Sequence, residues 1–262
     1  MKTPLHPSAS VSEAGKKGQF GRADLHMHTT YSDGMFNVPT LMNYLATLNM
    51  VYKERHGFHY LDVIAITDHD TILGSIHAKE YSEKHNLEID VLLGSEISSS
   101  EGHILAIDIK ENIQKHKPAS YTIDAIHEQG GLAIAAHPYS LLRLLGVRSV
   151  GHLIKTHSFD AVETVNSNIT EFFGNMYTTS VNRLSAALPE VGNSDAHFFS
   201  AYEKVYTAFQ GKTKQELLDS IRNKTTKAHG MVWNFRDLWN YFQDKRTLNR
   251  YCKNNNITPH LF

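Results

Sequence analysis

Asp24-Leu25-His26-Met27-His28-Thr29-Thr30-Tyr31-Ser32-Asp33-Gly34 is the stretch around which the rest of the chain is arranged. Residues 22–25 are typical of a short strand, in which side chains two positions apart point to the same side. His26 and His28 therefore face one side, where the chain leaves the strand for a Ser-Asp-Gly turn. Two adjacent imidazoles with Asp33 close behind can bind a divalent cation. One His-x-His is weak evidence for a metal site, so the question is whether the pattern recurs.

Length and charge exclude several classes of protein. The 262 residues fit one large domain or two small ones, and a single α/β barrel has this size. The formal net charge is −1, so the overall charge gives no attraction to nucleic acid polymers or to anionic membranes. We therefore expect neither a membrane nor a long nucleic acid as a partner.

Cysteine content and the N-terminal segment indicate the compartment. Cys252 is the only cysteine, so no intramolecular disulfide can form and a reducing, cytoplasmic location is expected. No apolar run approaches the length that spans a membrane. Residues 1–20 lack the apolar core of a secretory signal and are expected to form a flexible tail. Residues 21–262 are expected to form one barrel domain that includes a C-terminal helix; the sequence does not indicate the oligomeric state.

Short apolar runs alternate along the chain with segments whose apolar residues have helical spacing. This alternation predicts a parallel sheet with helices packed on it. The predicted strands are residues 22–25, 61–66, 89–93, 103–109, 132–136, 159–165, 189–192 and 205–209. The predicted helices are residues 39–55, 73–85, 121–129, 169–188, 214–222 and 234–249. The last of these carries Phe235, Leu238, Trp239 and Phe242 on one stripe, which is most simply a face that packs on the core or caps it.

Polar clusters lie at the ends of these strands, where α/β barrels and doubly wound sheets place their active sites. The clusters come from at least five strands. A barrel brings them together, whereas an open sheet would spread them along a line, so we expect an α/β barrel. The clustered side chains are His26, His28, Asp33, Asp68, His69, Glu96, His103, His137, Asp195 and His197.

The combined charge of this cluster points to bound metal. Six imidazoles and several carboxylates in one pocket would repel like charges, and each desolvated charge costs several kcal/mol unless it is paired or bound to metal. Asp195 and His197 repeat the two-residue spacing of the first histidine pair, so they also share one face. Nitrogen and oxygen ligands without thiolate suit Zn, Mn or Fe.

Each of these residues also has a simpler interpretation. Any single histidine is as readily a core or surface residue as a ligand. Asp68 and Asp70 are placed where they could cap the helix that follows them. For the whole set, however, this interpretation requires coincidence at five strand ends.

The cluster resembles the motifs of the PHP family, the polymerase-and-histidinol-phosphatase metal-dependent phosphoesterases. The resemblance runs in order from about residue 22 to residue 210. It implies a distorted (β/α)7 barrel with a metal cluster at the C-terminal ends of the strands. The motifs that carry it are Asp24-Leu25-His26-Met27-His28-Thr29 with Ser32-Asp33-Gly34, Thr67-Asp68-His69-Asp70, Gly94-Ser95-Glu96, Ala136-His137-Pro138 and Asn193-Ser194-Asp195-Ala196-His197.

The resemblance also implies two to three divalent metal ions (Zn, Mn or Fe) with nine ligands. The first position takes His26, His28, Glu96 and Asp195. Glu96 bridges to the second position, which takes His103 and His137. The third position takes Asp33, His69 and His197. Several nucleotide-acting members have a helical insertion between the strand that carries His103 and the His-Pro motif. Only 33 residues separate His103 from His137 here, so the resemblance does not specify a nucleotide.

The activity expected from these residues is hydrolysis of a small phosphomonoester by metal-activated hydroxide; a nucleotide or oligonucleotide phosphate is within this class. Two metals that share Glu96 can lower the pKa of a bridging water. The metals stabilise the charge that develops on phosphorus oxygens, and Asp195 or His197 could assist the leaving group. Three divalent ions, three carboxylates and one hydroxide sum to about +2, which complements a phosphate dianion.

Two arginines are candidates for binding the phosphate. Arg143 follows the His137 strand end by six residues, and a guanidinium there could hold phosphate oxygens with two hydrogen bonds. Arg148 is the next candidate. The simpler interpretation of Arg143 is a solvated residue opposite the leucines that flank it.

Two other classes of function compete with the phosphoesterase. Amidohydrolase barrels, which hydrolyse C–N or ester bonds, also open with His-x-His, but typically bridge two metals with a carboxylated lysine. No lysine stands at a predicted strand end here. A structural metal module without activity is the third interpretation, and it predicts eroded motifs, which the chain does not show.

Overall fold

The computed structural model describes residues 20–141, 148–234, 236, 239, 242 and 246. Within them, nine strands form one sheet in the order β7-β6-β5-β4-β3-β2-β1-β8-β9. The strands are β1 (Phe20–Asp24), β2 (Val63–Ile66), β3 (Asp90–Ser98), β4 (His103–Ile107), β5 (Leu132–Ala135), β6 (Ala161–Asn166), β7 (Glu190–Asn193), β8 (Val205–Gln210) and β9 (Lys227–Gly230).

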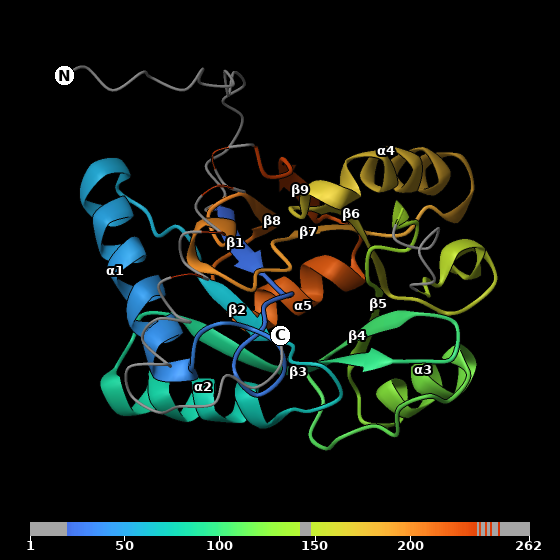
Figure 1. Ribbon diagram of the computed structural model, residues 1–262, viewed down its shortest axis with the longest axis horizontal. Helices are drawn as coiled ribbons and strands as arrows, with labels where there is room; N and C mark the ends of the chain where they lie inside the picture. The colour runs from blue at the N-terminus through green and yellow to red at the C-terminus, as the bar shows by residue number, and fades with distance from the viewer. Residues whose placement is uncertain are drawn as a thin grey trace.

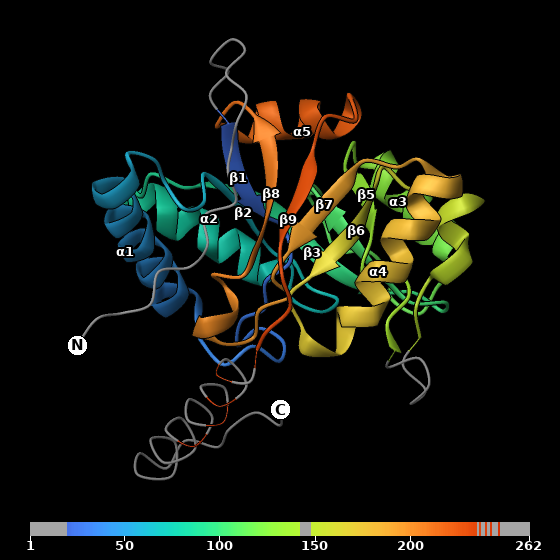
Figure 2. The ribbon, with the colours of Figure 1, turned by 90° about the horizontal axis from the view of Figure 1, so that it is seen from above.

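The sheet curls into a nearly closed barrel with helices outside it. Figure 1 looks into the ring of strands, with α1 (Val38–His56) and α2 (Leu73–His85) on the left. On the right lie α3 (Ala119–Glu128) and α4 (Phe172–Val181). Figure 2, turned by 90°, shows α5 (Lys214–Arg222) across one end of the barrel, at the top. The α/β barrel predicted from the sequence is confirmed.

Strands β2 and β5 are buried on both faces, which explains their continuous apolar runs. In β2 the side chains of Val63 and Ala65 point into the barrel, where they join a cluster that includes Leu217 and Ile221 of α5. Ile64, between them, packs outward in the cluster that contains α1 and α2. Helix α5 therefore closes the end of the barrel opposite the loops that follow β1, which Figure 2 shows at the bottom.

Side-chain hydrogen bonds join β7, at one end of the sheet, to β8 and to the end of β1. The hydroxyl of Thr207 on β8 donates to the carbonyl oxygen of Gly192 on β7 (2.9 Å) and accepts from its N–H (3.0 Å). The Asn193 side-chain oxygen accepts from Leu25 N–H (3.0 Å), and Asp24 accepts from Ser194 N–H (3.1 Å). These bonds form a seam that holds β7 against β1 and β8.

The prediction of a purely parallel sheet is wrong at two strands. β4 pairs antiparallel with both β3 and β5, and β8 pairs antiparallel with both β1 and β9. The other seven strands run in one direction. The sheet as a whole has nine strands, so the seven strands of the predicted (β/α)7 barrel are not confirmed. Only a short turn separates β3 from β4, which leaves no room for the crossover that a parallel pair requires.

Several elements differ from the sequence prediction. The helix predicted over 169–188 is divided into a 3₁₀ turn (Ile169–Glu171), α4, and a π-helical turn (Asn182–Ala186). Strand β3 continues through Glu96, which was predicted to follow the strand. Strand β9 was missed, because three of its four residues are exposed and carry no apolar pattern.

The predicted C-terminal helix falls mostly outside the described residues, including Phe235 and Leu238. Trp239 and Phe242 are described as helical and are 63% and 49% exposed, so the prediction that they pack on the core is wrong for these two. In the described part of the chain, the helices fall short of the length and hydropathy that crossing a membrane requires.

Candidate metal centre

The barrel brings together all nine predicted ligands at the ends of its strands. Glu96 lies in the middle of the group and is 1% exposed. Its Oε1 lies 2.8 Å from His103 Nδ1 and 3.1 Å from His137 Nε2. Its Oε2 lies 3.1 Å from His26 Nε2, 3.2 Å from His28 Nε2 and 3.3 Å from His69 Nδ1. The two carboxylate oxygens therefore face two different sets of imidazoles, which is the geometry of a bridging ligand.

Two further groups of ligand atoms adjoin Glu96. Asp195 Oδ1 lies 3.4 Å from His26 Nε2 and 3.3 Å from His28 Nε2. Asp33 Oδ2 lies 3.2 Å from His197 Nε2 and 3.8 Å from His69 Nε2. Four sets of three or four side chains each have ligand atoms within 4.8 Å of one another. They are His28-Asp33-His69-His197, His26-Glu96-His137, His26-His28-Asp195 and His69-Glu96-His103.

His103 reaches this end of the barrel because β4 is antiparallel. It is the first residue of its strand, whereas the other ligands lie late in a strand or just after one. In an antiparallel strand the first residue lies at the same edge as the carboxyl ends of its neighbours. The pairing of His103 with Ser98 in the β3–β4 ladder places it beside the Glu96 end of β3.

Burial and neighbouring charges shift the pKa values of the candidate ligands when no cation is bound. Burial lowers the pKa of His28, but the adjacent carboxylates of Asp195 and Glu96 outweigh this and raise the pKa to about 10. Burial likewise opposes the effect of Glu96 on His137, whose pKa nevertheless rises to about 9. Burial acts to raise the pKa of Glu96, but the surrounding imidazoles hold it well below its ordinary value. In the metal-free protein, protons on the imidazoles supply the positive charge that the carboxylates require.

The residues fit divalent cations in chemistry as well as in spacing. His26 Nε2 and His28 Nε2 are buried and have no hydrogen-bond partner, although both face carboxylate oxygens. A buried polar atom without a partner is costly, and a cation among these nitrogens and oxygens would satisfy it. The donor set has no sulfur and suits Zn, Mn or Fe.

Glu163 on β6 is a functional residue that the sequence analysis missed. It is fully buried, and its Oε1 lies 3.1 Å from His26 Nδ1. The side chains of Asn166 and Asn193 and the His137 N–H all donate to the same carboxylate at 2.9 Å. A carboxylate on the second imidazole nitrogen fixes the ring and directs the first nitrogen toward a metal. The available signal was a single charged residue inside an apolar strand, Ala-Val-Glu-Thr-Val.

Glu163→Gln is expected to weaken metal binding without removing a ligand. The amide keeps the shape but loses the charge that holds the His26 ring, and loss of such a partner typically costs about 10- to 100-fold in metal affinity. The measurement is a competition titration against a chromophoric chelator. Glu80→Gln, the same change at an exposed residue of α2, is the control. Equal metal affinity in the two variants would mean that Glu163 only fills space.

The simpler interpretation of Asp68 and Asp70, that they cap α2, does not hold, because the N-cap residue of this helix is Ile72, whose side chain makes no capping hydrogen bond. Asp68 is buried and accepts hydrogen bonds from Thr29 N–H, from the Thr29 hydroxyl and from the Ser32 hydroxyl, each at 2.7 Å. Asp70 accepts from Ser98 N–H (2.8 Å) and from the Ser98 hydroxyl (3.1 Å). Asp68 therefore organises the loop that carries Asp33, and Asp70 ties the second motif to the end of β3.

The two arginines proposed for phosphate binding have different outcomes. Arg143 lies outside the described residues. Arg148 is exposed, and its guanidinium donates to the carbonyl oxygen of Ser100 (2.9 Å), in the turn that leads to His103. Arg148 therefore contacts the backbone of the turn before His103, at the edge of the centre. Its role in substrate binding stays a prediction.

The ligands open onto a cleft of about 130 Å³. It contains one carboxyl group that the sequence analysis missed, Glu171, which is 3% exposed. Burial raises the pKa of Glu171, and the Ser140 hydroxyl donates to its Oε1 (2.5 Å). The cleft is lined by His69, Glu96, His103, His137, Ser140, Asn168, Glu171, Asp195 and His197.

Comparisons with known proteins agree with this fold. A family model described as PHP-associated matches residues 185–226. The uncharacterised protein MJ1587 of Methanocaldococcus jannaschii is 35% identical over 173 residues, which are 64% of this chain and 94% of that protein. A two-domain protein from Bacteroides vulgatus that contains a predicted PHP-like metal-dependent phosphoesterase matches with a TM-score of 0.61 at 19% identity, over 87% of this chain and 70% of that one.

PsfC from Pseudomonas syringae matches with a TM-score of 0.59 at 14% identity, over 88% of this chain and 99% of that one. The two solved structures share the fold at low identity, whereas the archaeal relative is covered almost completely. The chain belongs to the PHP family.

Proposed function

We propose that this protein is a metal-dependent phosphoesterase that hydrolyses a small phosphomonoester. The observation that carries the proposal is the position of Glu96, whose two oxygens face separate sets of imidazoles. Membership of the PHP family supports it, as does the phosphoesterase named in the Bacteroides protein.

The candidate ligands divide among three metal positions. Glu96 joins two of the metal positions, with His26, His28 and Asp195 on one side and His103 and His137 on the other. Asp33, His69 and His197 hold the third. Divalent ions in these positions would activate water and neutralise charge on phosphate oxygens. Three divalent ions against three carboxylates leave a net charge of about +3, which complements a phosphate dianion.

The proton for the leaving group has more than one candidate source. Asp195 and His197 remain predictions for this role. Burial acts to raise the pKa of Asp195, but the charges of His26 and His28 outweigh it and hold this pKa far below its ordinary value. Glu171 lines the same cleft, and its pKa is raised, so it is a further candidate.

An amidohydrolase-like activity has no specific observation in its favour. Among the described residues that line the cleft there is no lysine, and the central carboxylate is that of Glu96. The arrangement therefore favours a phosphoesterase over a barrel that bridges its metals with a carboxylated lysine.

Metal content and substrate turnover test the proposal together. Protein purified without chelator is expected to contain more than one transition-metal ion per chain by elemental analysis. It is expected to release inorganic phosphate from members of a panel of small phosphomonoesters, nucleotides and short oligonucleotides. Chelation should abolish the activity, and the readded ion should restore it. A protein that is active and stable without metal would contradict the proposal.

A further inference from the structure

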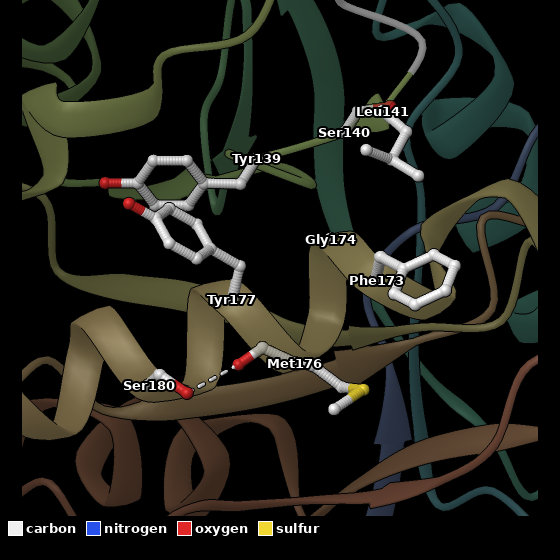
Figure 3. A pocket seen from close by; sticks show the side chains of 8 residues that line it. All are labelled: Tyr139, Ser140, Leu141, Phe173, Gly174, Met176, Tyr177 and Ser180. Atoms are coloured by element: carbon white, nitrogen blue, oxygen red, sulfur yellow. Dashed lines mark hydrogen bonds between the residues drawn. The ribbon is translucent and has the colours of Figure 1, made fainter.

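An apolar groove of about 520 Å³ adjoins the metal cleft. One wall is the segment that follows β5, with Tyr139, Ser140 and Leu141, and the other is α4. Ser140 lines both the groove and the cleft. Figure 3 shows Tyr139 and Tyr177 on one side of the groove and Phe173 and Leu141 on the other. The remaining lining residues are Gly174, Met176 and Ser180.

The two chain segments that form the walls of the groove also contribute to the lining of the metal cleft. His137 is a candidate ligand, and Tyr139 is only two residues beyond it. On the other wall Glu171 lines the cleft, and Phe173, two residues on, lines the groove. The hydrogen bond from the Ser140 hydroxyl to Glu171 joins the walls at the boundary between the two hollows. The groove and the cleft are therefore neighbouring hollows that share Ser140 in their lining.

A close backbone approach fixes the spacing of the walls. A Cβ at Gly174 would lie 2.9 Å from the carbonyl oxygen of Tyr139, so only glycine allows α4 to come this near. The Tyr139 and Tyr177 rings pack edge to face, with centroids 4.8 Å apart at 86°. The packing of α4 against Tyr139 therefore determines the shape of the groove. Its volume is in the range of small-molecule sites.

The groove is exposed, aromatic and uncharged. Phe173 is 62% exposed, Met176 59% and Tyr177 58%, and none of the described residues that line the groove is acidic or basic. Aromatic rings and a methionine sulfur pack well against another ring. The described lining residues therefore favour an apolar group over a second phosphate. The cleft therefore suits the anionic end of a substrate, and the groove suits a flat apolar group.

We infer that this groove binds the leaving alcohol of the substrate, which is a phosphomonoester with an aromatic ring one or two atoms from the ester oxygen. The inference rests on the proposed phosphoesterase function and adds a substrate class to it. Hydrolysis then breaks the bond between phosphorus and the alcohol oxygen. Water supplies the oxygen to phosphate, and the alcohol takes up a proton and remains in the groove until release.

Two esters with similar leaving groups test the substrate class. 2-Naphthylmethyl phosphate and ethyl phosphate both release primary alcohols, so a difference between them reports binding more than intrinsic reactivity. Their kcat/KM ratio is expected to be at least about tenfold in favour of the aromatic ester. Octyl phosphate is the comparison for an aliphatic chain, and its preference over the naphthyl ester would overturn the aromatic assignment.

Variants of α4 test the site. Phe173→Ala removes one aromatic wall, and Ser180→Trp fills the groove from an exposed position; each is expected to bring the ratio of kcat/KM values close to one, mainly through KM. Leu184→Ala changes an apolar side chain that is 87% exposed and lies outside the groove, and should leave the ratio unchanged. Equal ratios in all four proteins would overturn the inference.

A binding measurement separates this inference from the proposed function. 2-Naphthylmethanol carries no phosphate, so its binding to metal-free protein, followed by saturation-transfer NMR, needs neither metal nor turnover. Binding is expected in the wild type and its loss in Ser180→Trp. If neither ester is hydrolysed while this pattern of binding holds, the phosphoesterase proposal fails and the groove remains a site for aromatic rings. Absence of naphthylmethanol binding would overturn the subsite itself.

Discussion

Glu96→Gln is expected to remove activity and metal together. The amide oxygen can contact one metal position, but the side chain loses the charge that lets its two oxygens serve two positions at once. We expect the metal content to fall by at least one ion per chain. The value of kcat/KM should fall by roughly a thousandfold or more, because both water activation and charge neutralisation depend on the bridged pair. Rate and metal content are measured on the same sample.

The control for this variant separates a bridging ligand from a structural carboxylate. Glu80→Gln makes the same chemical change on the exposed face of α2 and should alter neither quantity. A Glu96→Gln protein that keeps its metals and remains within about tenfold of the wild-type rate would show that Glu96 merely supports the strand.

Removal of the metals is expected to lower the melting temperature, and the loss should grow as pH rises. Ions that bind only the folded state at about a thousandfold above Kd add about 4 kcal/mol, or on the order of 10 °C in Tm for a chain of this size. Protons replace them in the metal-free protein. The folded-state pKa values of His28 and His137 are raised to about 10 and about 9 from 6.5.

The sign of the pH effect follows from these two pKa values. A histidine with a raised pKa in the folded state stabilises that state fully below pH 6.5, and the contribution is lost as pH rises through the folded pKa. Metal-free protein should therefore lose stability between pH 6.5 and about 10. The stability of the metal-bound protein does not depend on these protons. Its ions compete with protons for the imidazole nitrogens, so metal binding strengthens as pH rises.

Calorimetry of metal-bound and chelator-treated protein at several pH values provides the measurement. The difference in Tm should widen from pH 6.5 to pH 9. The Glu96→Gln variant, with fewer ions to lose, should show a smaller difference at every pH. A difference that stays constant or narrows over this interval would contradict the assignment of protons to the imidazoles.

The candidate metal ligands were easier to recognise in the sequence than the residues that hold those ligands in place. His26 and His28 could be recognised because a two-residue spacing in a strand places both imidazoles on one face, and the same holds for Asp195 and His197. Glu163 has no such pattern. It stands alone in a buried strand, and its partners His26, Asn166 and Asn193 come from three separate segments, so only the folded barrel reveals the contact.

The fold shows the same division between local and non-local information. Strand β2 could be predicted from its unbroken apolar run, and α1 from its helical spacing. The reversal of β4 could not, because direction depends on the length of the β3–β4 turn and on partners far along the chain. The break between α4 and the π-helical turn was likewise hidden, since residues 169–188 have a continuous helical spacing of apolar residues.

The seam between β7 and the β1–β8 edge has a consequence for the order in which the molecule assembles. Its hydrogen bonds join residues 168 and 170 positions apart, Leu25 with Asn193 and Asp24 with Ser194. Contacts of such separation carry a high loop-closure entropy and slow folding. His26 and His28 lie on one side of this seam and Asp195 and His197 on the other. The candidate ligands therefore come together only after β7 has docked against β1 and β8. A chain that has not reached this stage of folding lacks part of the ligand set.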